Sequence, residues 1–444
     1  ALFPKAAPAC PPPPMASAAG SYLPAGGAWY PRPAEVFGYR IDVRVPAGQR
    51  VVVPGRLLAE QVPEGEGGHY RARFEFSHVT DGIDLMAGPW IVRERIVARG
   101  AGESLRLRTY FPAALDAEAG LAEAYLTDSA RYIERYSGSI GAYPFTEFSV
   151  VASPLPTGFG MPTLTYPGEQ VLRLPFIRAT SLGHEVLHNW WGNGVLVDYR
   201  SGNWSEGLTT FMADYAYKEE QSAAAAREMR LGWLRDFAAL PADAHQALAE
   251  FRSRTHGAAA AVGYGKAAMV FVMLRDLIGE EAFAHGIRSF WAQNRFRIAG
   301  WTDLKVAFEQ ASGRDLDAFF QQWLRLAGGA RVSIEQARFI AGAEGKGGLL
   351  KVELQQSRPA HVLHLPLQLE NGQAVQTRWV SLSQLRQTFE LAVDQAPQTV
   401  RLDPELRVWR RPDDGQLPPI LRQWMLAETP RLIIADEGDT ALVE

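Results

Sequence analysis

Hydrophobic and polar residues alternate in several segments between residues 22 and 112 of the chain. The alternation has a period of two, which is typical of strands with one buried face. Glycine and proline interrupt it at short intervals and mark turns. It is clearest in the segments 39–46, 50–54, 70–79, 90–97 and 105–111. We therefore predict a β domain over residues 22–112 and leave open that its start is truncated.

The pattern becomes helical after this domain. In residues 120–141, apolar side chains recur three and four positions apart, as they do on one face of a helix. A short apolar run at 147–154 predicts a strand, and further helical segments follow. Strand-like alternation then returns and predicts a small β-sandwich over residues 330–411. The predicted fold class is multidomain α+β, with a mostly helical domain over residues 113–329 between two β domains.

Both ends of the chain differ from these domains. Residues 1–21 begin with "ALFPKAAPACPPPPM", a proline-rich stretch that predicts a disordered leader. Residues 412–444 predict a tail or the start of a further segment. A signal peptide upstream of the first residue would not be visible in this sequence. Periplasmic, membrane-associated and cytoplasmic locations therefore all stay open.

Composition argues against several classes of partner. The chain has 45 basic and 49 acidic residues, a formal net charge of −4 and no block of basic residues. We therefore expect no nucleic acid partner. No apolar run approaches the roughly 20 residues of a membrane-spanning helix, so we expect no transmembrane segment in this chain. The single cysteine, Cys10, rules out a metal site built from several thiolates.

One short motif carries the candidate chemistry. In "LGHEVLHNWWGN", His184 and His188 stand four residues apart, with Glu185 directly after the first. Four residues are close to one helical turn, so both imidazoles lie on one face and can hold one ion. Two neutral imidazoles suit Zn²⁺, and an adjacent carboxylate can take a proton from the water that attacks a carbonyl.

A hydrolytic zinc site of this kind also needs a third ligand, and a carboxylate fits the charge and hardness of the ion. The segment "NWSEGLTTFMADY" places Glu206 in the first turn of the next predicted helix, with Ser205 as a candidate N-cap. A glutamate there also complements the helix dipole, but with the two histidines it completes a ligand set. Asp214, on roughly the same helical face, is a candidate to orient one histidine.

These motifs resemble a known family. "HEVLHNWWGN" followed by "NWSEGL" is similar to the pattern of the membrane alanyl aminopeptidase and leukotriene hydrolase family of gluzincin zinc metallopeptidases. The resemblance implies a thermolysin-like catalytic domain in which His184, His188 and Glu206 bind one Zn²⁺ and Glu185 is the general base. The 17 residues between His188 and Glu206 are one fewer than in the family pattern, and a deletion in the loop "VDYRSG" would explain this.

The resemblance extends to a later helix. "VGYGKAAMVFVML" looks like the family segment whose tyrosine donates a hydrogen bond to the oxyanion, and that tyrosine corresponds to Tyr264. A phenol in this place would stabilise charge that develops only in the transition state. A tyrosine at the start of a helix can also serve packing alone.

One segment departs from the family pattern. The family has a G-x-M-E-N segment whose glutamate binds the free amine of the substrate, and the matching stretch here is "TGFGMPTLTY". Gly160 and Met161 fit the pattern, but Pro162 stands where the glutamate is expected. The backbone of Gly160, Met161 and Pro162 can still bind a substrate strand. Glu169, a few residues later, is a candidate replacement for the missing acid.

The sequence as a whole predicts a zinc-dependent metallopeptidase that acts on peptide substrates. By resemblance it is similar to an aminopeptidase that removes N-terminal residues. Two alternatives stay open, namely an endopeptidase or oligopeptidase without amine recognition, and a non-catalytic zinc-binding protein that binds peptides.

Overall fold

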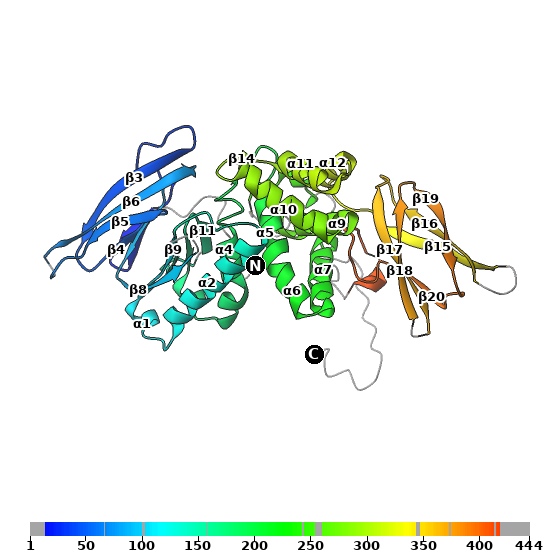
Figure 1. Cartoon of the computed structure of the whole chain (residues 1–444), viewed down its shortest axis with the longest axis horizontal. Coiled ribbons are helices and arrows are strands. Elements are labelled where there is room, and N and C mark those ends of the chain that lie inside the picture. Colours follow the sequence, from blue (N-terminus) through cyan, green and yellow to red (C-terminus); the bar gives the residue numbers. More distant parts are fainter. Residues whose placement is uncertain are drawn as a thin grey trace.

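The structure is a computed structural model, which describes residues 14–65, 67–99, 103–156, 158–241, 244–253, 260–342, 347–372, 374–412 and 414–417. In these residues, a β-rich N-terminal region, a helical middle region and a β-rich C-terminal region follow one another along the chain. Figure 1 shows strands at the two ends of the long axis and helices between them. This arrangement confirms the predicted α+β class.

The N-terminal region contains two small antiparallel sheets. One has the strand order β1-β2-β7-β4 and the other has the order β3-β6-β5. Buried residues such as Phe74 alternate with exposed ones along much of β6, as the period of two predicts. The strands are β1 (Met15–Ser17), β2 (Gly20–Leu23), β3 (Phe37–Pro46), β4 (Arg50–Val52), β5 (Arg56–Gln61), β6 (His69–Thr80) and β7 (Leu85–Gly88).

The start of this region corrects one prediction. Residues 1–13 lie outside the described part of the chain, but β1 pairs with β2, and β2 pairs with β7. Tyr22 on β2 is buried, and its ring stacks on Phe159 with the centroids 5.8 Å apart. The prediction of a disordered leader up to residue 21 is therefore wrong from Met15 onward. The partner strand β7 is distant in sequence, so the local pattern gives no sign of this pairing.

A five-stranded sheet leads into the candidate site, and its order is β11-β12-β10-β9-β8. All residues of β10 are buried, as expected of a central strand, and β10 is parallel to both β9 and β12. β11 is an edge strand that runs antiparallel to β12. Two strands of this sheet, β8 and β9, precede residue 113, and the other three follow it. The domain boundary after residue 112 stays a prediction. The strands are β8 (Trp90–Ala98), β9 (Ser104–Pro112), β10 (Glu147–Val151), β11 (Gly158–Met161) and β12 (Leu164–Pro167).

The middle region packs short helices around the buried helix α9 (Ala267–Ile278), in which residues 267–274 are all buried. Among the residues that the structure describes here, three π-helical segments interrupt these helices: η2 (Ile177–Ser181), η3 (Phe211–Tyr215) and η6 (Ala261–Lys266). Such segments are rare and are often found at functional sites. The α-helices are α1 (Ala113–Asp116), α2 (Leu121–Ser139), α3 (Glu169–Leu172), α4 (Leu182–Leu187), α5 (Ser205–Thr210), α6 (Ala216–Gln221), α7 (Ala223–Ala238), α10 (Glu280–Asn294), α11 (Trp301–Ser312) and α12 (Asp317–Arg325). Short elements complete the region: η5 (Leu248–Glu250), β13 (Leu196–Val197) and β14 (Ile298–Ala299).

The C-terminal region consists of two three-stranded sheets, β15-β16-β19 and β18-β17-β20. Leu350 on β16 and Leu365 on β17 are both buried, as expected if the two sheets face each other. The strands are β15 (Val332–Ala341), β16 (Gly348–Gln356), β17 (Leu363–Asn371), β18 (Ala374–Leu382), β19 (Arg386–Val393) and β20 (Thr399–Leu402), and η8 (Asp414–Gln416) follows.

Most of the predicted tail, residues 418–444, lies outside the described part of the chain. In the part that is described, no helix is both long enough and apolar enough to cross a membrane.

Candidate metal centre

The histidine motif lies where η2 continues into α4. His184 is in α4, and His188 follows directly after its last residue. The two Nε2 atoms are 3.2 Å apart, so the helical spacing brings both rings to one point, as the sequence predicts. Both residues are largely buried, which shields the pair from bulk water.

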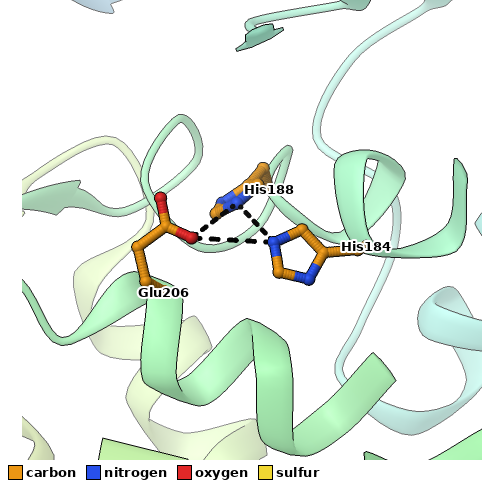
Figure 2. Close-up of side chains that lie close together, drawn as sticks. All are labelled: His184, His188 and Glu206. Carbon is orange, nitrogen blue, oxygen red and sulfur yellow. Dashed lines mark hydrogen bonds and ion pairs between the residues drawn. The ribbon is translucent and has the colours of Figure 1, made fainter. Parts of the chain in front are cut away.

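Glu206, in the first turn of α5, completes the group. Its Oε2 lies 3.6 Å from Nε2 of His184 and 3.5 Å from Nε2 of His188. Figure 2 shows the three side chains pointing toward one another, with Glu206 on a different helix from the histidines. In the described residues, these three form the one group of histidine, cysteine or acidic side chains whose ligand atoms all lie within 4.8 Å of one another.

The outer ring nitrogens show that the site fits a metal ion. Nδ1 of His184 lies 2.6 Å from Oδ2 of Asp214, and Nδ1 of His188 lies 2.9 Å from the carbonyl oxygen of Trp191. Both partners accept hydrogen bonds, so each Nδ1 carries a proton, and in the neutral ring Nε2 then has a free lone pair. Two such lone pairs 3.2 Å apart repel each other unless a cation lies between them. Two imidazole nitrogens and one carboxylate oxygen are a ligand set that Zn²⁺ prefers.

The electrostatics of these residues favour a cation. Burial lowers the pKa of His184, but Asp214 outweighs burial and the net pKa is well above the ordinary value. Burial likewise lowers the pKa of His188, and Glu206 more than compensates. Burial raises the pKa of Glu206, yet the histidines hold it well below its ordinary value. The carboxylates around the histidines therefore favour positive charge at the site, and a bound dication would supply that charge.

Asp214 reaches His184 because of a local irregularity in its helix. Two turns of a regular α-helix contain about seven residues, but Asp214 lies eight residues after Glu206. The π-helix η3 spans Asp214, and its wider turn takes up the additional residue. The carboxylates of Glu206 and Asp214 therefore both face the histidines. The 2.6 Å between Oδ2 of Asp214 and Nδ1 of His184 is a hydrogen-bond distance, as the predicted orienting role of Asp214 requires.

Glu185 is buried beside the edge strand β11. A Cβ atom added to Gly160 would lie 2.6 Å from Oε2 of Glu185, so the glycine leaves room for this carboxylate. Burial raises the pKa of Glu185, and the two histidines oppose this effect. Gly160, one of the three predicted substrate-binding residues, thus lies beside Glu185 and His188 of the histidine motif.

The other two predicted substrate-binding residues have different surroundings. The side chain of Met161 packs into a hydrophobic cluster with Tyr22 and Trp90. Pro162 is in the turn between β11 and β12, and Thr163 follows it with a positive φ of 67°. The amide of Thr163 donates to Oδ1 of Asn189 at 2.9 Å, which ties this turn to the residue after His188.

Glu169, the candidate replacement for the missing acid, lies in the first turn of α3. Its carboxylate pairs with Arg173 at 3.1 Å. This ion pair leaves it less suited to bind a substrate amine, and its role in amine recognition stays a prediction.

Tyr264 is in the π-helix η6, which packs against α5, the helix of Glu206. Its ring contacts the ring of Phe251 edge to face, with the centroids 6.2 Å apart. α5 and α9 also approach closely, because a Cβ atom on Gly207 would lie 2.2 Å from Cβ of Ala267. The helices that carry Glu206 and Tyr264 are thus packed together, while the catalytic role of Tyr264 stays a prediction.

The structure corrects the predicted cap of α5 and adds residues that the sequence analysis missed. No side chain caps the helix at its N-cap residue, Trp204, and Ser205 is its first residue. Instead, Oδ1 of Asn203 accepts hydrogen bonds from the amide and the hydroxyl of Ser205, at 3.0 Å and 2.8 Å. The preference of asparagine for positions just before a helix is a signal that could have identified Asn203. No such local signal exists for Asn189, because its partner Thr163 is distant in sequence.

Comparisons with known proteins agree with this geometry. Residues 178–323 match the model of the peptidase family M1 domain. The chain is 28% identical over 203 residues to aminopeptidase N of Streptomyces lividans, an alignment that covers 41% of the chain and 22% of that protein. It is 29% identical over 200 residues to aminopeptidase N of Haemophilus influenzae, covering 42% of the chain and 22% of that protein. The aligned part thus spans about a fifth of the length of these relatives.

Two solved structures share the fold. Aminopeptidase A of Legionella pneumophila, in complex with aspartic acid, has a TM-score of 0.69 at 16% identity, covering 93% of this chain and 49% of that one. The M1 zinc metallopeptidase of Deinococcus radiodurans has a TM-score of 0.59 at 21% identity, covering 71% of this chain and 72% of that one.

Proposed function

Through residues 178–323 the chain belongs to peptidase family M1, and from this premise we propose that it is a zinc-dependent metallopeptidase that hydrolyses peptide bonds. The observation that carries the proposal is the convergence of His184, His188 and Glu206, with both outer histidine nitrogens held by hydrogen-bond acceptors. A buried glutamate next to the first histidine adds the group that hydrolysis needs.

The cofactor is one zinc ion held by the two histidines and Glu206. When bound, the ion would act as a Lewis acid toward the substrate carbonyl and would lower the pKa of a water molecule bound to it. Three protein ligands are the number usual in catalytic rather than structural zinc sites. Asp214 and the carbonyl of Trp191 fix the orientation and tautomer of the two rings.

Glu185 moves the protons. Its burial raises its pKa above the ordinary value of a glutamate, which makes the carboxylate a better proton acceptor near neutral pH. It takes a proton from the attacking water and later delivers one to the departing amine. Gly160 preserves the space that this carboxylate needs.

Tyr264 serves as a hydrogen-bond donor to the oxyanion. Its phenol hydroxyl can donate a hydrogen bond to an oxygen that becomes negative only in the transition state. Its position in η6, packed against α5, keeps it near the ligand helix.

The edge strand β11 binds the substrate. Edge strands have backbone groups without a neighbour in their sheet, and an extended peptide can add to them as a further strand. Because Gly160 is next to Glu185, a peptide on β11 would present its scissile bond to the motif. This supports a peptide as the substrate class.

Whether cleavage starts from the N-terminus depends on amine recognition. The names of the relatives favour removal of N-terminal residues. The turn at Pro162 and Thr163 favours the alternative, an endopeptidase or oligopeptidase, because it has no acid to pair with an ammonium group. A buried ammonium without a partner is costly, so a site without an acid loses much of the reason to prefer free N-termini.

A pair of peptides separates the two candidates. The zinc-loaded protein is given one peptide with a free N-terminus and the same peptide acetylated, and the products are identified by mass spectrometry. An aminopeptidase releases single residues from the free peptide only, whereas an endopeptidase cuts both peptides internally. If neither peptide is cleaved at any zinc concentration, the peptidase proposal is wrong.

A further inference from the structure

Asn203 connects two segments that carry different parts of the site. It is 5% exposed, and its Oδ1 accepts from the amide and hydroxyl of Ser205, the residue before Glu206. Its Nδ2 donates to the carbonyl oxygen of Arg252 at 3.1 Å, and its backbone amide donates to that of Phe251 at 2.7 Å. One buried side chain thus holds the start of α5 against the segment after η5.

That segment in turn contacts Tyr264. The ring of Phe251 is 1% exposed and meets the Tyr264 ring edge to face. The same ring lies against Gly263, where a Cβ atom would come within 2.0 Å of it. Phe251 therefore packs on η6 both at Tyr264 and at the residue before it.

Further contacts bring the two segments close together. Gly202 has a positive φ of 106°, and a Cβ atom there would lie 2.5 Å from the carbonyl oxygen of Leu248. The guanidinium of Arg252 donates to the carbonyl oxygen of Arg200 at 3.2 Å. The hydrogen bonds of Asn203 are thus part of a close approach between residues 200–203 and 248–252.

We propose that Asn203 is a positioning residue that fixes Tyr264 relative to Glu206 through the ring of Phe251. The inference rests on the proposed peptidase function. Asn203 touches neither the metal ligands nor the substrate in this account, and it acts by setting the distance between the oxyanion donor and the metal ligands. Such a distance matters because a misplacement of about 1 Å can lower a rate by about 100-fold.

The amide chemistry of Asn203 allows a narrow test. Asn203→Asp retains an oxygen that accepts from Ser205 but loses the donor to Arg252, since a carboxylate oxygen would face that carbonyl. Phe251→Leu retains an apolar side chain but loses the ring that contacts Tyr264. Asn294→Asp is the matched control, because Nδ2 of Asn294 also donates to a backbone carbonyl, that of Phe290 at 3.0 Å, at the end of α10.

Each variant is made in the wild-type and the Tyr264→Phe backgrounds, and kcat and KM are measured at saturating zinc. We expect Asn203→Asp and Phe251→Leu to lower kcat about 10- to 100-fold with KM nearly unchanged. In the Tyr264→Phe background the same changes should cost less than about twofold, because the donor they position is already gone. Asn294→Asp should leave kcat unchanged. Equal losses in both backgrounds would overturn the proposal.

Two measurements that do not depend on activity accompany the kinetics. Zinc content should stay at one ion per chain in every variant, and hydrogen exchange of the amides in residues 260–266 should be faster in Asn203→Asp. Unchanged exchange there would contradict the proposed link even if the wild-type protein proved inactive. If the zinc-loaded wild-type protein were inactive, the peptidase function would be refuted, but the proposed link between Asn203 and Tyr264 would still be tested by hydrogen exchange.

Discussion

Removal of the Asp214 carboxylate tests how the outer contacts of the site support the metal. Asp214 lies 2.6 Å from Nδ1 of His184, and both groups are largely buried. A hydrogen bond to a charged partner contributes about 1.5–3 kcal/mol. Loss of such an outer partner typically weakens metal affinity about 10- to 100-fold, which corresponds to roughly 1.4–2.7 kcal/mol. The energy of the hydrogen bond and the expected loss of binding energy for zinc are similar, so removal of Asp214 should act mainly by weakening zinc affinity.

A graded pair of variants separates charge from hydrogen bonding. Asp214→Asn keeps a neutral oxygen that can accept from Nδ1, and we expect zinc affinity to fall about tenfold. Asp214→Ala removes the acceptor, and we expect a fall of about 100-fold. At saturating zinc, kcat should change less than about threefold in Asp214→Asn, because the ligands themselves remain.

The assay is a competition for zinc against a chelator of known affinity, read by metal content and by peptide hydrolysis. The control is Asp317→Asn. Asp317 is the first residue of α12, and its carboxylate pairs with Lys305 on α11 at 3.0 Å. That variant should retain wild-type zinc affinity. Wild-type affinity in Asp214→Ala would refute the reasoning that the hydrogen bond to His184 supports metal binding.

Three further perturbations follow from the structure. Gly160→Ala places a Cβ atom 2.6 Å from Oε2 of Glu185, so kcat should fall about 10- to 100-fold while zinc content is kept; unchanged kcat would show that β11 does not confine this carboxylate. Burial lowers the pKa of Lys266 from 10.5 to about 7. At a pH between these two values, Lys266 is protonated in the unfolded chain but not in the folded one, so the unfolded state binds more protons. The unfolding free energy of the wild type should therefore rise by up to about 1.4 kcal/mol per pH unit from pH 8 to 9. In Lys266→Met this increment should be missing in urea unfolding at the two pH values, and equal slopes for both proteins would contradict it. Gly207→Ala brings a methyl group 2.2 Å from Cβ of Ala267, so urea unfolding should show a loss of about 1–3 kcal/mol, and undiminished stability would contradict the close packing of α5 on α9.

The sequence predicted those parts of the site that depend on local spacing. The four-residue interval between His184 and His188 fixes one helical face, and their ligand nitrogens do converge. Glu206 could be named because a carboxylate at the start of the next helix completes a zinc ligand set. Alternation identified strands such as β3, β6 and β16, whose inner and outer faces differ in polarity.

Contacts between distant segments escaped prediction. The strand β2 is ordered by pairing with β7, and Asn203 holds α5 through the carbonyl of Arg252, which no local pattern reveals. The π-helix η3 also gives no signal in the hydrophobic period, although it brings Asp214 to His184. In each case the deciding partner is remote in sequence or the backbone departs from the regular period.

The exchange of Glu185 for glutamine tests the central claim most directly. Glutamine has nearly the same shape but cannot accept a proton, whereas the three metal ligands are unchanged. We expect Glu185→Gln to bind one zinc ion per chain and to hydrolyse the free-amine peptide at least about 100-fold more slowly than the wild type. Full hydrolysis by a zinc-loaded Glu185→Gln protein would contradict the account, because the proton transfers would then not depend on this carboxylate.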